Sequence, residues 1–137
     1  MSHQGLSFDA ALREAQAEGY AEADPTYDIE GIDSAHKITI LARLGFGYAV
    51  KLDEVYTGGI SHINNLDIEF AQELGYRIKL LAIAKRVNSL LDIRVHPTMI
   101  PKENILATVD GVFNAICVTG DMVGPNIFIG QGAGALP

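Results

Sequence analysis

The sequence has little cysteine, no long apolar run and few basic residues, and each scarcity excludes a class of protein. The single cysteine, Cys117, permits no internal disulfide, which fits a reducing compartment. It lies in an apolar stretch and is predicted to be a small buried hydrophobic residue rather than a nucleophile. No apolar run is long enough to span a bilayer. The N-terminus lacks the basic and apolar regions of a signal peptide, so the protein is predicted to be cytoplasmic.

Basic residues are outnumbered by acidic ones, with 10 Lys and Arg against 17 Asp and Glu and a net charge of -7. Phosphate backbones repel such a chain, so nucleic acid is not expected as a partner. An acidic surface is also a common solubility device and says nothing about a substrate. The 137 residues, 48% of them hydrophobic, are typical of one globular domain with its own core.

Several catalytic and binding motifs are absent from the sequence. The four histidines are scattered and have no cysteine partners, which argues against a zinc site. There is no GxSxG motif, no motif centred on a cysteine nucleophile and no dinucleotide fingerprint with its βαβ unit. The glycine-rich run from Gly130 to Gly134 matches neither that fingerprint nor a Walker loop, and by itself it indicates a turn.

Helical periodicity dominates the first half of the chain. It predicts helices over residues 7–18, 33–44 and 67–74. Residues with capping and stopping preferences flank them: Ser7, Asp33 or Ser34, and Asn64 or Asn65 before them, and Gly19, Gly45, Gly47 and Gly75 at their ends. Residues 20–32 show no clean period and are predicted to form a structured loop, whereas residues 48–65 fit no pattern.

In the second half of the chain, apolar and polar residues alternate instead of following a helical period. This alternation predicts a hairpin of residues 76–87 and 91–100, joined near Asn88, and a second hairpin that turns around Gly120. Pro97 and Pro101 indicate a strand end or a sheet edge, and residues 103–108 a helical turn. This order predicts an α+β fold: mostly β-sheet in the C-terminal half, helices packed on one face, and N-terminal helices that carry the loop.

The loop and the helix after it hold the unusual feature of the sequence, a group of carboxylates beside a lysine. Five carboxylates fall within twelve residues: Glu22, Asp24, Asp28, Glu30 and Asp33. Asp33 and Lys37 are four residues apart, so on a helix they can pair. One interpretation is a solvated loop with a helix cap and a surface ion pair worth well under about 1 kcal/mol.

The other interpretation is a polar site. A carboxylate is the natural counter-charge for the ammonium group of an amino acid. A lysine held among carboxylates and partly desolvated can move a proton to or from an alcohol or carbonyl oxygen. The carboxylates between Glu22 and Asp33 could also hold Mg²⁺, as in a metal-dependent lyase, although no spacing demands a metal. The residues alone leave these alternatives open.

The run from Gly19 to Lys37, GYAEADPTYDIEGIDSAHK, resembles the signature of homoserine dehydrogenases, whose pattern is close to GYxEaDPxxDvxGxDaaxKl. Other segments resemble further parts of that family, and together they cover nearly the whole chain: FDAALREAQAEGYAE, LDIEFAQELGYRIKLLA, VFNAICVTGD and GQGAGALP. The resemblance implies an α+β catalytic domain whose sheet mediates homodimerisation. It also implies conversion of L-homoserine to L-aspartate 4-semialdehyde, or the reverse, with NAD(P), on the route to threonine and methionine.

The resemblance assigns a role to several residues. Lys37 corresponds to the proposed proton donor and Glu22 to the residue that binds the amino acid. Asp28 and Asp33 correspond to residues lining the same pocket, and Tyr20 to one that borders the substrate. Gly132 corresponds to a glycine near the nicotinamide end of the cofactor. No metal ion is implied.

The family's nucleotide-binding domain, which carries a second active-site lysine, has no counterpart here, and neither has its regulatory domain. The glycine-rich end before Pro137 is typical of a segment that leads into another element. Residues 1–137 are therefore expected to form a single catalytic domain, truncated at both ends and inactive without its nucleotide-binding domain. The alternative is an isolated dimerisation or binding module with no activity of its own.

Overall fold

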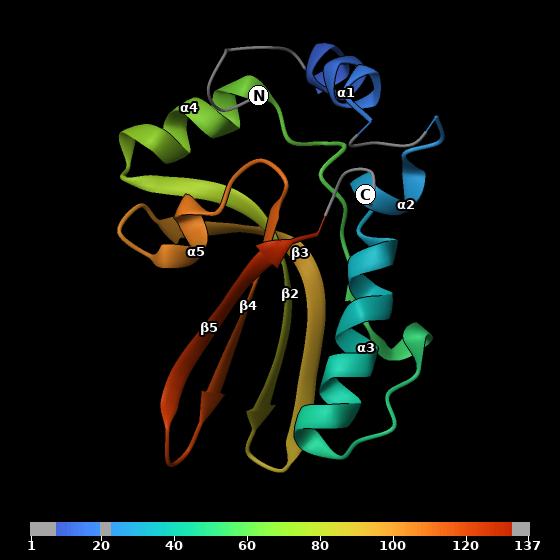
Figure 1. Cartoon of the computed structure of the whole chain (residues 1–137), viewed down its shortest axis with the longest axis vertical. Coiled ribbons are helices and arrows are strands. Elements are labelled where there is room, and N and C mark those ends of the chain that lie inside the picture. Colours follow the sequence, from blue (N-terminus) through green and yellow to red (C-terminus); the bar gives the residue numbers. More distant parts are fainter. Residues whose placement is uncertain (1–7, 20–22, 133–137) are drawn as a thin grey trace.

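The structure is a computed structural model, and it describes residues 8–19 and 23–132 (Figure 1). Helices dominate the first half of this part and strands the second, so the α+β prediction is confirmed. In chain order the elements are α1 (Phe8–Ala17), α2 (Thr26–Ile29), α3 (Ile32–Phe46), the 3-10 helix η1 (Leu52–Glu54), β1 (Tyr56–Thr57), α4 (Asn65–Glu73), β2 (Tyr76–Val87), β3 (Leu90–Pro101), α5 (Ile105–Thr108), β4 (Phe113–Gly120) and β5 (Gly124–Gln131).

Most of the predicted helix ends are confirmed. Gly19 follows α1 with a φ of 77°, and Gly75 follows α4 with a φ of 82°, a left-handed conformation in which glycine has no steric penalty. Asn64 caps α4, because its side chain accepts a hydrogen bond from the Asp67 amide at 3.0 Å and the Asp67 carboxylate accepts one from the Asn64 amide at 2.9 Å. Ser7 lies outside the described residues.

The start of α3 lies one residue before the predicted position, but the prediction for its cap is wrong. Neither Asp33 nor Ser34 caps this helix, because Gly31 occupies the N-cap position with a φ of 77° and no side-chain hydrogen bond caps it. The carbonyl of Gly31 accepts the first helical hydrogen bond, from the Ala35 amide at 2.9 Å. At the other end Gly47 is the C-cap, whereas Gly45 lies inside the helix.

The first sheet has the strand order β1-β3-β2. β2 and β3 form the predicted antiparallel hairpin, which runs from Tyr76 opposite Pro101 to Val87 opposite Leu90. β1, in the segment that fits no sequence pattern, pairs in parallel with Arg94 and Val95 of β3. Pro97 lies within β3, beyond the two residues that pair with β1, and Pro101 is the last residue of the strand. A sheet tolerates a proline at both kinds of position, because neither requires a backbone N–H to donate to a neighbouring strand.

α3 packs against one face of this sheet and forms the main core with it (Figure 1). Ala35, Ile38 and Ala42 recur at helical spacing and bury one stripe of α3. They contact Ile93 and Val95 of β3, and Val95 is fully buried with no exposed surface. The start of α3 therefore has a fixed position relative to β3.

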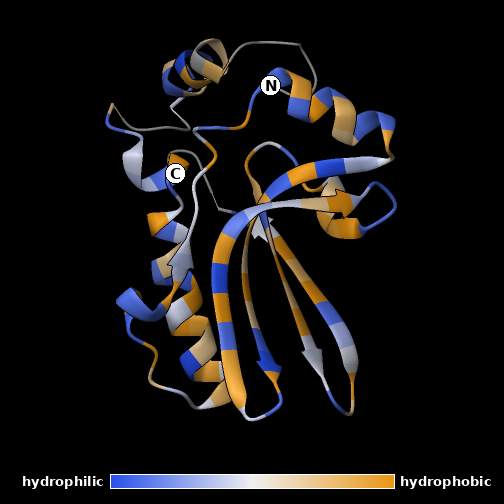
Figure 2. Cartoon of the chain, turned by 180° about the vertical axis from the view of Figure 1, so that it is seen from behind, coloured by the Kyte–Doolittle hydropathy of each residue, from blue (hydrophilic) through white to orange (hydrophobic). Residues whose placement is uncertain are grey.

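β4 and β5 form the second predicted hairpin, which is a separate two-stranded sheet in the described residues. Apolar residues run along the strands of both hairpins (Figure 2). In the second hairpin they are widely exposed, including Phe113, Ile116, Val118, Phe128 and Ile129. Cys117 is exposed as well, so the prediction that it is buried is wrong. The apolar residues next to it belong to a hairpin whose side chains are exposed to solvent.

A charged cluster joins β2 to the segment before β4. Arg77 donates hydrogen bonds to the carbonyl of Ala107 at 3.0 Å and to the carboxylate of Asp110 at 2.9 Å. Lys79 donates to the carbonyl of Val109 at 2.6 Å and to the same carboxylate at 2.7 Å. These bonds set the point at which the chain leaves the first sheet and enters the second hairpin.

Candidate active site

The carboxylate-rich segment before α3 is more regular than predicted. Residues 20–32 were expected to form a loop, but residues 26–29 form the short helix α2. The Asp24 carboxylate accepts hydrogen bonds from the Thr26 hydroxyl at 2.6 Å and from the Thr26 amide at 3.2 Å. These bonds stabilise the charged form and lower the pKa of Asp24. A single helical turn is too short to show a helical period in the sequence. The Asp24 carboxylate, which can accept hydrogen bonds from Thr26 at the start of such a turn, was the feature that could have predicted it.

Gly31 connects α2 to α3 and lies directly on the sheet. It is buried, and a Cβ atom at this position would lie 3.0 Å from Val95 Cγ1 and 3.5 Å from Thr57 Cγ2. Its φ of 77° is also a conformation that favours glycine. Glycine is therefore required here both by the turn and by the close approach to β1 and β3.

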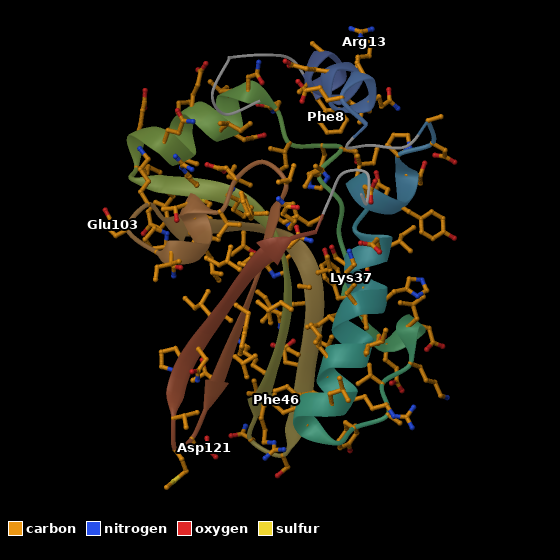
Figure 3. The ribbon with its side chains drawn as sticks, in the orientation of Figure 1. Phe8, Arg13, Lys37, Phe46, Glu103 and Asp121 are labelled. Atoms are coloured by element: carbon orange, nitrogen blue, oxygen red, sulfur yellow. The ribbon has the colours of Figure 1, made fainter. Side chains whose placement is uncertain are left out.

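Asp33 and Lys37 form the ion pair that their spacing predicts. The Lys37 Nζ atom lies 2.5 Å from the Asp33 carboxylate, within the first turns of α3. In the view of Figure 3, Lys37 projects from α3 toward the end of β5. Both side chains are exposed, at 58% for Lys37 and 43% for Asp33. The chain on its own therefore does not desolvate the lysine, and the pair contributes little to stability.

The other predicted site residues are less closely connected in the structure. Asp28 lies on α2 and is exposed, and among the described residues no hydrogen bond or ion pair joins its carboxylate to Asp33 or Lys37. Tyr20 and Glu22 lie outside the described residues. The structure thus brings together one carboxylate and the lysine, on a helix whose start is fixed against the sheet.

Gly132 follows directly after β5, and two contacts define its position. Its amide donates a hydrogen bond to the Val112 carbonyl at 2.9 Å. A Cβ atom on Gly132 would overlap the side chain of Asn114, whose amide carbon would be 2.5 Å away. Asn114 therefore accounts for the absence of a side chain at this position. Sequence reasoning did not single out Asn114, because the contact depends on the β4–β5 register.

Gly58 and Gly59 are the other residues that sequence reasoning did not assign. The Gly58 amide donates to the Val95 carbonyl at 2.7 Å, and the Ile60 amide donates to the Ile29 carbonyl at 2.7 Å. The segment after β1 thus joins β3 to the last residue of α2. A glycine pair was visible in the sequence, but the hydrogen-bond partners of this segment, Ile29 and Val95, lie far away on either side and no local pattern identifies them.

The described residues show neither a metal-binding cluster nor a membrane-spanning helix. No group of three or more His, Cys, Asp or Glu side chains in this part of the chain is arranged to hold a metal ion. None of its helices has the length and apolar character needed to cross a bilayer.

The fold and the site thus define an α+β domain that presents a paired lysine and carboxylate at the start of a helix packed on a sheet. The family model for homoserine dehydrogenase matches residues 1–137, the whole chain. The chain therefore belongs to the homoserine dehydrogenase family.

Relatives in several bacteria are similar over the full chain. The homoserine dehydrogenase of Pseudomonas aeruginosa is 52% identical over 137 residues, and that of Neisseria gonorrhoeae is 53% identical. The chain spans 32% of the length of each of these relatives. The crystal structure of a homoserine dehydrogenase from Thiobacillus denitrificans matches 98% of this chain and 31% of its own, with a TM-score of 0.95 and 53% identity.

Proposed function

We propose that this domain is the substrate-binding part of an enzyme that interconverts L-homoserine and L-aspartate 4-semialdehyde with NAD(P). The observation that carries the proposal is the contact between Asp33 and Lys37 at the start of α3, within the segment that resembles the family signature. An acid/base group and a carboxylate are the side chains that an amino acid with a reacting alcohol or carbonyl requires.

Lys37 has the role of the proton carrier in this proposal. In the reducing direction its ammonium group protonates the oxygen on C4 of the semialdehyde, and in the oxidising direction the neutral amine takes the proton from the alcohol. Asp33 holds the ammonium group by an ion pair at 2.5 Å and so restricts where that proton can be delivered. The proton therefore comes from a side chain on a rigid helix rather than from a loop.

The remaining carboxylates bind the other end of the substrate. Glu22 is proposed to bind the ammonium group of the amino acid, with Asp28 and Asp33 lining the same pocket and Tyr20 at its border. Asp28 is exposed on α2, a short distance along the chain from Asp33, and is therefore accessible to a ligand. Burial of this pocket beneath a second domain would exclude water and strengthen each of these contacts.

The described residues fit one end of NAD(P). Gly132 presents backbone alone at the end of β5, where its contacts with Val112 and Asn114 define its position, and is proposed to lie near the nicotinamide. When bound, NAD(P) accepts or supplies the hydride at C4 of the substrate. Since no dinucleotide fingerprint occurs in the sequence, we propose that a separate nucleotide-binding domain holds the rest of the cofactor.

The test is homoserine-dependent reduction of NAD(P) by the full-length enzyme that contains this domain. We expect Lys37→Ala to lower kcat by at least about 10², the usual scale for loss of a general acid or base. His36→Ala is the matched control, because His36 is the exposed neighbour on the same helix, and we expect it to retain the parent rate. A near-normal rate for Lys37→Ala would refute the role of Lys37.

The same assay on the 137-residue chain tests whether turnover requires a separate nucleotide-binding domain. We expect no turnover from this chain, because the proposal assigns only the nicotinamide end of NAD(P) to it. Robust turnover by the chain alone would contradict that part of the proposal.

We also propose that the domain forms a homodimer through the β4–β5 hairpin. The support is the exposed apolar surface of that hairpin, where Phe128 lies opposite Ile116 on one face and is 63% exposed. Exposed apolar surface that is continuous along a sheet typically marks an interface between proteins. A second copy of the chain carries the same surface and can cover it by two-fold symmetry.

A further inference from the structure

Gly59 is the point at which the segment after β1 comes closest to the turn between α2 and α3. This glycine is buried. A Cβ atom on it would lie 2.5 Å from the Ile29 carbonyl oxygen, 2.6 Å from Glu30 Cα and 2.5 Å from Glu30 Oε2. The first two are backbone atoms, which cannot move aside as the end of a flexible side chain can. Any side chain at Gly59 must therefore displace the turn itself.

Hydrogen bonds on both sides of Gly59 keep it in this position. The amide before it, that of Gly58, binds the Val95 carbonyl of β3, and the amide after it, that of Ile60, binds the Ile29 carbonyl of α2, both at 2.7 Å. We call residues 58–60 the glycine strap. The strap is thus bonded to the sheet at one end and to the turn at the other.

The turn is also supported from its other side. Gly31 lies against the sheet, with Val95 Cγ1 only 3.0 Å from the place of its missing Cβ atom. The backbone from Ile29 to Gly31 is therefore held between the strap and β3. An added Cβ atom at Gly31 or at Gly59 would therefore press on this turn or on its support.

The position of this turn determines the position of the proposed site. The Gly31 carbonyl accepts the first hydrogen bond of α3, from the Ala35 amide at 2.9 Å, so the turn and the helix move together. Asp33 and Lys37 lie in the first turns of that helix. We propose that Gly59 is a positioning residue for homoserine: its missing side chain lets the strap hold the α2–α3 turn where Asp33 and Lys37 meet the substrate. This inference rests on the proposed function.

The experiment compares Gly59→Ala with the unmodified full-length enzyme in steady-state kinetics for both substrates. We expect kcat/KM for homoserine to fall by about 10- to 100-fold, since a misplacement of about 1 Å can cost a factor of that size. The KM for NAD(P) should stay within about twofold of its original value, because the proposed nucleotide site is mostly on another domain. A role limited to stability would lower the melting temperature without this difference between the two substrates.

Gly58→Ala is the matched control within the same strap. A Cβ atom on Gly58 would meet its nearest neighbour, the Tyr56 hydroxyl oxygen, at 3.5 Å, an ordinary van der Waals distance. We expect this variant to behave as the unmodified enzyme for both substrates. Gly59→Ala with kinetics like those of Gly58→Ala would overturn the inference, and so would an equal loss of kcat/KM for homoserine in both variants.

A second variant covers the case in which Gly59→Ala does not fold. Val95→Ala removes the Cγ1 atom that supports Gly31 from the sheet side, without adding any atom. We expect kcat/KM for homoserine to fall at least about threefold with an unchanged KM for NAD(P), and an unchanged kcat/KM would overturn the inference. If the unmodified enzyme shows no homoserine-dependent turnover, the proposed function fails and this inference fails with it. If the unmodified enzyme is active and the variants have the same kinetics as it has, the inference alone fails.

Discussion

Two glycines near the end of the described chain illustrate how much a single residue's surroundings matter. Gly130 has open space where a Cβ atom would be, whereas the same atom on Gly132 would overlap the side chain of Asn114. Both belong to the same glycine-rich run and look alike in the sequence. Only the second position has a structural reason to be glycine.

Gly132→Ala is therefore expected to move the end of β5 away from Asn114 and to weaken cofactor binding in the full-length enzyme. We expect the KM for NAD(P) to rise at least about threefold, because the added Cβ atom would lie 2.9 Å from the Asn114 Cβ atom, a contact that rotation of the Asn114 side chain does not relieve. Gly130→Ala is the matched control and should leave the KM unchanged. Equal KM values for the two variants would show that Gly132 does not position the cofactor.

Asp33 and Lys37 form an ion pair that is more important for geometry than for stability. Their ion pair is well formed but exposed, and exposed pairs contribute less than about 1 kcal/mol to stability. Stability alone is thus a weak reason for this pair. Its value in the proposed mechanism is geometric, because the pair fixes the lysine on the first turns of a helix that is packed against β3.

At the scale of elements, the Asp110 cluster determines how the second hairpin leaves the first sheet. Partial burial raises the pKa of Asp110, but hydrogen bonds and charge from Lys79 and Arg77 outweigh that effect and lower the pKa overall. A lowered carboxylate pKa contributes stability above the unfolded value of 3.8, and that stability is lost as the pH falls through the folded pKa.

Asp110→Asn is therefore expected to lower the free energy of unfolding at pH 7, and the difference is expected to disappear once the pH lies well below the folded pKa of Asp110. The side chain is 44% exposed, so solvent screening should keep the difference below about 1 kcal/mol. Denaturant unfolding of both proteins at a series of pH values measures it. Asp53→Asn removes an exposed carboxylate elsewhere and is the control. A difference that grows as the pH falls would contradict the assignment.

The second hairpin is the part of the described structure whose apolar surface is most in need of a covering layer. Its strands pair only with each other in the described residues, and both of their faces carry exposed apolar side chains. A two-stranded hairpin is marginally stable by itself and normally requires a further packing layer. The proposed homodimer provides that layer from a second copy.

Phe128→Lys tests this assembly, because it places a charge at the centre of the exposed face. We expect the dimer dissociation constant to rise by at least about tenfold, since loss of a central aromatic side chain typically has an effect of that order or larger. Analytical ultracentrifugation over a range of concentrations measures it. Leu44→Lys makes the same change at a position on α3 that is 79% exposed, and should leave the dimer intact. A monomeric parent protein, or a Phe128→Lys protein that dimerises equally well, would contradict the proposal.

The features that depend on neighbouring residues could be predicted from the amino-acid sequence alone. Alternation located both hairpins, Asn64 identified the start of α4, and the spacing of Asp33 and Lys37 predicted their ion pair. These features follow from hydrogen bonds and side-chain directions within a few residues, which a linear pattern records. The family signature was equally local, because it lies in one uninterrupted run of residues.

The features that depend on distant residues became clear only from the folded chain. There Gly31 is the N-cap of α3, Cys117 is exposed on an uncovered hairpin, and Gly59 lies against the turn before α3. Each outcome depends on which backbone occupies the neighbouring space, and that neighbour is far away in the sequence or belongs to another layer. The pairing of Lys37 with Asp33 could therefore be predicted from the sequence, whereas the contacts that hold α3 in place could not.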